Sequence, residues 1–208
     1  MSRRKPAHPA RKQPRQARAQ VTFEAILDGT IRVLNEQGAD GASTTRIAEV
    51  AGVSVGRLYQ YFADRDAIFE ALQDREFERA TAMLSAALEQ DTLDQRQVAH
   101  AVIAGLLGLY RSAPGLHRLL AVNGMHVSPA DRVVAFDRKI VETLRVFFEL
   151  SPLGVTRPNK HAAAFVLYQS VRATLLAAIL EEPSGLSDDV LLDEVTTLVV
   201  GHLMGRTG

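Results

Sequence analysis

The sequence predicts an all-α protein of about nine helices, in which a small N-terminal bundle precedes a larger helical region. Apolar residues recur at helical spacing along most of the 208 residues, and no alternating stretch is long enough for a strand. Proline, serine and aspartate residues divide these stretches. In addition, the segment 44–62, TTRIAEVAGVSVGRLYQYF, has the spacing of two short helices that cross over a tight turn.

The first 20 residues carry seven arginines and lysines, three prolines and no acidic residue. Because this segment has almost nothing to bury, we expect a disordered basic arm over residues 1–20. Such an arm can follow phosphates or enter a minor groove, or it can be a solubilising tail. It lacks the apolar core of a secretory signal.

The next segment, 21–38, predicts an amphipathic helix that supports the helix pair behind it. Its apolar face is formed by Phe23, Ile26, Leu27, Thr30, Ile31 and Leu34.

In the helix pair, Gly52 falls where the chain leaves the first helix in a left-handed conformation that favours glycine. Ala48 is small enough for close helix crossing, with Ile47, Val53 and Leu58 as apolar contacts. We expect Ser54 to cap the second helix and Thr44 or Thr45 to cap the first.

The outer surface of the second helix combines basic, amide and phenol groups, which suits a DNA major groove. Arginine pairs with guanine and glutamine with adenine, whereas tyrosine hydroxyls more often reach phosphates. The pattern therefore predicts a helix-turn-helix, with an eight-residue reading segment that begins at Val55. An ordinary helical hairpin is the alternative, and the leading helix argues against it.

Residues 21–72 resemble the TetR (tetracycline-repressor) family of transcriptional regulators. The resemblance rests on the leading helix, the helix pair, LYQYF at 58–62 and DRDAIFEAL after it. It implies phosphate contacts from Tyr59 and Tyr61, with Tyr61 standing where histidine is common and Arg65 where lysine is common. The expected DNA-binding residues are Thr44, Thr45, Arg46, Ser54, Val55, Gly56, Arg57, Tyr59, Gln60, Tyr61 and Arg65.

Charge is unevenly distributed along the chain. Residues 1–65 hold 11 basic and 6 acidic residues, whereas residues 66–208 hold 13 basic and 18 acidic ones. Because the basic part is attracted to phosphates and the acidic part is repelled, this asymmetry helps to orient the protein on DNA. We expect a DNA-binding domain over 21–65 and a ligand-binding and dimerisation domain over 66–208.

Six helices are predicted in the second domain, the first of them capped by Asp64. Their expected ranges are 66–89, 93–112, 115–122, 129–150, 158–180 and 188–204.

The last two helices are apolar on more than one face, which predicts a four-helix homodimer interface of the kind the family uses. A buried helix of a monomer is the alternative. A dimer would place two reading helices on successive major grooves of a palindromic operator. The expected interface residues are Phe165, Tyr168, Leu176, Leu180, Leu191, Val195, Leu198, Val199 and His202.

The family resemblance also implies a cavity for a small-molecule effector. Arg172 lies among apolar residues and, if buried, needs an acidic ligand or Glu142 as its partner. The candidate ligand-binding residues are His100, Tyr110, His117, Met125, Phe147, Phe165, Tyr168, Gln169 and Arg172, and Asn123, His126 and Phe136 are further polar or aromatic candidates.

The remaining composition argues against other classes of function. The chain has no cysteine, and no carboxylate stands at ligand spacing from His117 or His126, so we expect no metal and no cofactor. No catalytic spacing is present, which argues against an enzyme. The best candidate for a membrane span, 173–180, is too short, and we expect a cytoplasmic protein.

Together these features predict a ligand-responsive DNA-binding regulator, a repressor that a small molecule releases from its operator. A transcriptional activator and a ligand-independent architectural DNA-binding protein are the alternatives.

Overall fold

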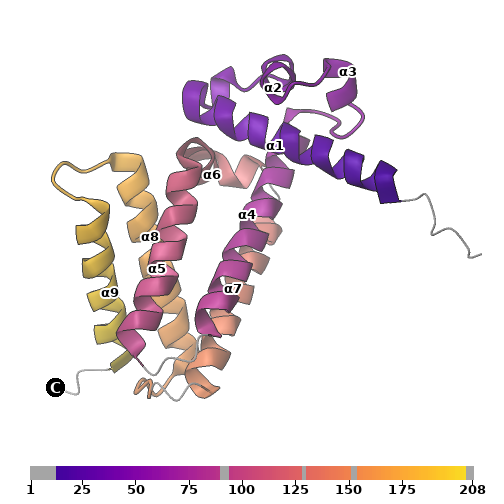
Figure 1. Cartoon of the computed structure of the whole chain (residues 1–208). Helices are drawn as coiled ribbons and strands as arrows, with labels where there is room; N and C mark the ends of the chain where they lie inside the picture. Colours follow the sequence, from indigo (N-terminus) through magenta and orange to yellow (C-terminus); the bar gives the residue numbers. More distant parts are fainter. Residues whose placement is uncertain (1–12, 90–93, 128–129, 151–153, 205–208) are drawn as a thin grey trace, which may run out of the picture. The chain divides into compact units, whose positions relative to one another are not determined.

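The computed structural model describes residues 13–89, 94–127, 130–150 and 154–204. Within these ranges every regular element is an α-helix, and the nine helices α1 to α9 confirm the all-α prediction (Figure 1). The chain divides into two compact units, residues 1–68 and residues 69–208. The helix α4, Arg65–Leu88, carries the chain from the first unit into the second.

The first unit begins with α1, Gln13–Gly41, in which Gly38 has the non-helical backbone angles φ 68° and ψ −171°. The structure therefore differs from the expected arm over 1–20, because residues 13–20 are helical, while residues 1–12 lie outside the described residues. Glutamine, alanine and arginine form helices readily, so this basic segment extends the helix that follows. Ile26, Leu27 and Leu34 of α1 are at most 1% exposed.

The second helix, α2 (Thr44–Ala51), ends as the sequence predicts: Gly52 is left-handed, with φ 69° and ψ 29°. Its predicted start is wrong in detail, because the capping side chain belongs to Ser43, whose Oγ accepts from the backbone N–H of Arg46. The helix already begins at Thr44, so the residue before it occupies the capping position. A Cβ placed on Gly29 of α1 would lie 2.9 Å from the Cβ of Ala51, so α1 and α2 pack closely there.

The third helix, α3, is shorter than the eight residues expected from Val55 onward. It covers Val55–Leu58, and the Oγ of Ser54 accepts from the N–H of Arg57, which confirms the predicted cap. Beyond Leu58 the N–H groups of Gln60 and Tyr61 bond carbonyls three residues back, at 3.2 and 2.9 Å. The chain therefore continues as tight turns instead of an α-helix.

The second unit contains most of α4 and the helices α5 to α9. Next to α4, the elements α5, α7, α8 and α9 run alongside one another in Figure 1, and α7 packs on α8 and α5 on α9. Their bounds are α5 Gln95–Ser112, α6 Pro114–Val127, α7 Ala130–Leu150, α8 Lys160–Glu181 and α9 Asp188–Met204.

The helix starts of this unit follow their capping residues. Asp64 accepts from the N–H of Ala67 at 2.8 Å, as expected. Asp94 and Asn159 cap α5 and α8. Pro114 opens α6, as expected, and this helix extends past the predicted end at residue 122. The predicted cap at residues 128–129 lies outside the described residues.

One described helix, α8, is long and apolar enough to cross a membrane by length and composition alone, with a mean hydropathy of 1.6 over its most apolar stretch. The prediction from the sequence concerned only residues 173–180 and overlooked the apolar length of the whole helix. Ala164 and Leu175 are nevertheless fully buried within the unit, so α8 serves as its central core helix.

Candidate functional site

The segment that follows the Gly52 turn presents polar side chains outward from a buried anchor. Leu58 is 0% exposed and Phe62 is 5% exposed, and the Phe62 ring stacks on Phe23 at a centroid distance of 5.1 Å. Tyr59, by contrast, is 51% exposed. Residues 44–46 and 54–61 are called the recognition surface below.

Three side chains of the recognition surface form one cluster. The guanidinium of Arg57 donates from Nη1 to Gln60 Oε1 at 2.7 Å and from Nη2 to Tyr61 Oη at 3.0 Å. It also lies 5.2 Å from the centre of the Tyr61 ring. Both Arg57 and Gln60 are exposed, so the cluster orients two groups that suit guanine and adenine edges.

The start of α2 contacts Tyr59, the residue that precedes Gln60 of this cluster. Thr44 Oγ1 and Tyr59 Oη lie 3.2 Å apart, which ties α2 to the end of α3. Arg46 pairs with Glu49 at 2.9 Å, and Arg65 lies 3.7 Å from Asp66. Of the other expected DNA-binding residues, Thr45, Ser54 and Gly56 are exposed and Val55 is half-buried.

The second unit contains a cavity of about 520 Å³ that is lined mainly by apolar side chains of α4, α5, α7 and α8. Phe77 of α4 and Phe136 of α7 stack on each other in its wall, with ring centres 3.9 Å apart. Gly105 of α5 admits Met83 of α4, whose Sδ would lie 2.8 Å from a Cβ at that position. Ligand pockets in proteins have volumes of this size.

Buried tyrosines contribute polar groups to the cavity wall. Burial raises the pKa of Tyr110 to about 12, with Arg172 opposing this rise and Asp137 adding to it. Tyr168 donates to Asp137 Oδ1 at 2.6 Å, and its burial, together with this bond, raises its pKa as well. Both phenols therefore stay protonated and can donate hydrogen bonds at neutral pH.

Sequence reasoning missed two buried polar residues of α4 that line the cavity, Gln73 and Glu76, each 3% exposed. Glu76 Oε2 lies 3.6 Å from His117 Nε2, so a carboxylate does stand beside this histidine, contrary to expectation. The two residues come from different helices, so local spacing could not reveal the pair. The usable signal was periodicity, because Glu76 follows the buried Leu72 by one helical turn.

The cavity brings together only some of the candidate ligand-binding residues. Tyr110, His117, Phe136, Phe147, Tyr168 and Arg172 line it. His100 and Phe165 are exposed instead. Gln169 does not line the cavity, but its Oε1 accepts a hydrogen bond from Arg172 Nη2 at 3.1 Å. The side chains of Asn123, Met125 and His126 lie outside the described residues.

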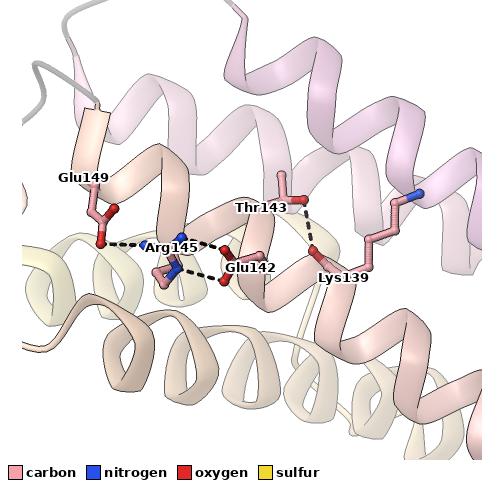
Figure 2. Close-up of polar contacts among 5 residues, drawn as sticks. All are labelled: Lys139, Glu142, Thr143, Arg145 and Glu149. Atoms are coloured by element: carbon pink, nitrogen blue, oxygen red, sulfur yellow. Dashed lines mark hydrogen bonds and ion pairs between the residues drawn. The ribbon is translucent and has the colours of Figure 1, made fainter.

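The suggested pairing of Arg172 with Glu142 is wrong. Glu142 accepts from Arg145 Nε at 2.7 Å and Nη2 at 2.5 Å, and Arg145 also reaches Glu149 at 2.6 Å (Figure 2). These residues share an exposed face of α7, so local partners one turn away satisfy the carboxylate. The hydrogen bonds from Arg145 lower the pKa of Glu142.

The expected interface residues of α8 and α9 also divide into two groups. Phe165 is 51% exposed and Leu198 55% exposed. Leu176, Leu180 and His202 are half-buried. Tyr168, Leu191, Val195 and Val199 belong to the chain's own core and are at most 9% exposed, because each helix turns that face inward.

A supported helix pair with an outward polar surface, followed by a separate helical unit that encloses a cavity, defines a helix-turn-helix DNA-binding regulator. Residues 26–72 match the bacterial regulatory proteins of the tetR family, and residues 94–203 match the tetracyclin repressor-like C-terminal domain. The chain belongs to the TetR family of DNA-binding transcriptional regulators.

Curated relatives are similar over part of their length. The nucleoid occlusion factor SlmA of Haemophilus ducreyi is 33% identical over 98 residues, which are 47% of this chain and 48% of that protein. The HTH-type transcriptional regulator BetI of Escherichia coli is 28% identical over 128 residues, 53% of this chain and 66% of the relative. The chain thus spans about half the length of the SlmA proteins it matches.

Solved structures share the fold over nearly the whole chain. The fatty acid degradation regulator FadR from Bacillus halodurans has a TM-score of 0.73 at 16% identity, covering 95% of this chain and 100% of that one. A putative TetR-family transcriptional regulator from Rhodococcus sp. has a TM-score of 0.68 at 19% identity, covering 89% and 100%. At these identities the likeness concerns the fold alone.

Proposed function

We propose that the protein is a homodimeric cytoplasmic repressor that a small-molecule effector releases from a palindromic operator. The observation that supports a bound effector is the cavity of about 520 Å³ in the second unit, whose wall combines apolar side chains with buried polar ones. A protein that bound DNA without an effector would gain nothing from such a volume, since unfilled space in a core is destabilising.

Homodimer formation is supported by apolar side chains that the single chain leaves exposed on α8 and α9. Phe165, Val166, Val190, Leu198 and Met204 are each 47–55% exposed. Contact with the same surface of a second copy would bury them around a two-fold axis. Two recognition surfaces spaced by about 34–36 Å would then fit successive major grooves.

The release step is a shift between two populations of the dimer. α4 is one uninterrupted helix whose first residues belong to the first unit and whose Gln73, Glu76, Phe77 and Met83 line the cavity. An effector that fits the non-binding arrangement better lowers operator affinity by the difference between its two binding free energies.

The test is a titration against DNA from the region upstream of the protein's own gene, at fixed salt, with and without candidate effectors. We expect saturable specific binding that a cavity ligand weakens. Specific binding that no cavity ligand changes would remove the effector from the proposal and favour a ligand-independent architectural role. Binding that a ligand strengthens, with increased transcription, would indicate an activator.

The basic segment 1–20 is proposed to contact DNA phosphates. A chain that lacks it should show a flatter dependence of DNA affinity on salt, because fewer counterions are released on binding. An identical slope with and without the segment would make it a passive tail.

A further inference from the structure

The cavity has a polar end and an apolar end, separated along the helices that enclose it. Gln73 and Glu76 lie in the first half of α4, and Leu84 and Leu88 lie near its end. With a rise of about 1.5 Å per residue, Glu76 and Leu88 are separated by roughly 18 Å along the helix. The cavity therefore suits an elongated molecule with different chemistry at its two ends.

Neighbouring helices repeat the same division. At the polar end, Tyr110 from the end of α5 lies over His117 of α6, with ring centres 4.4 Å apart. Toward the other end the wall is formed by Leu144 and Phe148 from the end of α7 and by Leu203 from the end of α9, all of them apolar, with Gln95 at the start of α5 as a polar exception.

Among the described residues, three buried atoms of the cavity wall have no hydrogen-bond partner. They are Arg172 Nε, Glu76 Oε2 and His117 Nε2, and the last two lie 3.6 Å apart, an ion-pair distance if the imidazole is protonated, on side chains that are only 4% and 8% exposed. A buried polar atom without a hydrogen-bond partner destabilises the fold, because its lost hydration is not replaced. A ligand group that donates to the carboxylate and also meets the imidazole nitrogen would satisfy Glu76 Oε2 and His117 Nε2.

The charges around the cavity decide what kind of group this is. Among the described residues its wall carries two carboxylates, Glu76 and Asp137, and one guanidinium, Arg172. Asp137 and Arg172 act with opposite sign on both Tyr110 and Tyr168, away from Glu76. Arg79 pairs with the other oxygen of Glu76 at 3.3 Å, but it is half-exposed and outside the wall. An anionic group beside Glu76 would therefore be repelled.

We propose that the effector is an elongated amphiphile whose polar end is an O–H or N–H donor without negative charge, an alcohol or an amine, bound between Glu76 and His117. Its hydrocarbon part lies toward Leu88 and Leu203. This inference rests on the proposed function, because it specifies the ligand that the regulator senses.

The test uses three probes of equal chain length, decan-1-ol, decylamine and decanoate, titrated calorimetrically into the full-length protein at neutral pH without DNA. We expect the alcohol and the amine to bind at least about tenfold more tightly than the carboxylate, since each can donate to Glu76, whereas Glu76 repels the carboxylate. Equal or tighter binding of decanoate would overturn the assignment.

Two variants locate the effect. Glu76→Gln keeps the shape and removes the charge, so it should weaken decylamine binding and strengthen decanoate binding. His117→Phe keeps the aromatic contact with Tyr110 and should weaken decan-1-ol binding. The matched control is Glu142→Gln, which removes a carboxylate from the exposed face of α7 and should leave all three affinities unchanged (Figure 2). Circular dichroism checks that each variant is folded, and unchanged affinity ratios in whichever of the two cavity variants folds would refute the site.

DNA binding is measured separately, so that the two proposals can fail separately. If the alcohol and amine bind as expected but leave DNA affinity unchanged, the ligand class stands and effector release is wrong. If decanoate binds best and releases DNA, effector release stands and the ligand class is wrong.

Discussion

The recognition surface and the polar end of the cavity differ in whether their polar atoms have hydrogen-bond partners within the chain. On the surface, Arg57 is satisfied by Gln60 and Tyr61, and Thr44 lies within hydrogen-bond distance of Tyr59. In the cavity, Glu76 Oε2 and His117 Nε2 are buried without partners. The difference teaches that polar side chains of the first site are bonded to one another within the chain, whereas the second leaves buried polar atoms that the proposed ligand would satisfy.

The largest expected effect comes from substituting Leu58, the buried residue of the recognition surface, and comparing it with its exposed neighbour Tyr59. Leu58→Ala should lower the free energy of unfolding of the first unit by about 2–5 kcal/mol, because it empties a fully buried position. The neighbouring Tyr59→Ala should change stability by no more than about 0.5 kcal/mol and weaken DNA binding instead. Urea unfolding measures the first effect, and equal losses in both variants would contradict it.

The cavity side can be tested through Tyr110, whose folded pKa of about 12 exceeds its ordinary value of 10.0. Because the unfolded chain releases this proton first, stability is full below pH 10 and falls as the pH rises toward 12. The loss should be about 2–3 kcal/mol.

The free energy of unfolding of the native chain and of Tyr110→Phe is compared between pH 10 and pH 12. Tyrosinate absorbance follows the titration, and the chain has no tryptophan to obscure it. The variant should lose less stability in alkali. An identical alkaline loss in both proteins would show that Tyr110 does not titrate as described.

The Arg57 cluster can be tested for base contacts. Arg57→Ala and Gln60→Ala should each weaken specific DNA binding by about 1–3 kcal/mol, since each removes a group suited to a base edge. Arg96→Ala is the matched loss of charge on the second unit, where Arg96 pairs with Asp193. If both cluster variants bind the operator normally, these residues do not read bases.

The smallest effect is expected on the exposed face of α7 (Figure 2). The Arg145 hydrogen bonds lower the pKa of Glu142, so they stabilise the folded chain above the ordinary pKa and lose this effect as the pH falls. Glu142→Gln should therefore be slightly less stable than the native chain near neutral pH and equal to it in acid. A difference that persists in acid, measured by thermal unfolding, would point to packing instead.

The sequence predicted best what depends on local spacing. The left-handed Gly52, the Ser54 cap and the buried Leu58 follow from one short segment, so the helix-turn-helix could be recognised before the structure. The close contact of Gly29 with Ala51 joins two helices, and the composition of neither one indicates it.

The cavity was harder to predict for the same reason. Glu76, Asp137 and His117 come from α4, α7 and α6, and only tertiary packing brings them to one wall. Arg172 lines this wall and could be singled out from the sequence, because a charged residue in an apolar stretch is visible there, but its bond to Gln169 was not foreseen. The inward face of α8 and α9 was likewise taken for a surface, since an apolar pattern does not show which neighbour covers it.

The occupied guanidinium of Arg57 has a kinetic consequence. On DNA that offers it no better acceptor, this side chain would keep its bonds to Gln60 and Tyr61 instead of contacting the bases. The two bonds would open only on a sequence whose bases offer the guanidinium a more favourable acceptor. Scanning can thus stay rapid while arrest is reserved for a matching site.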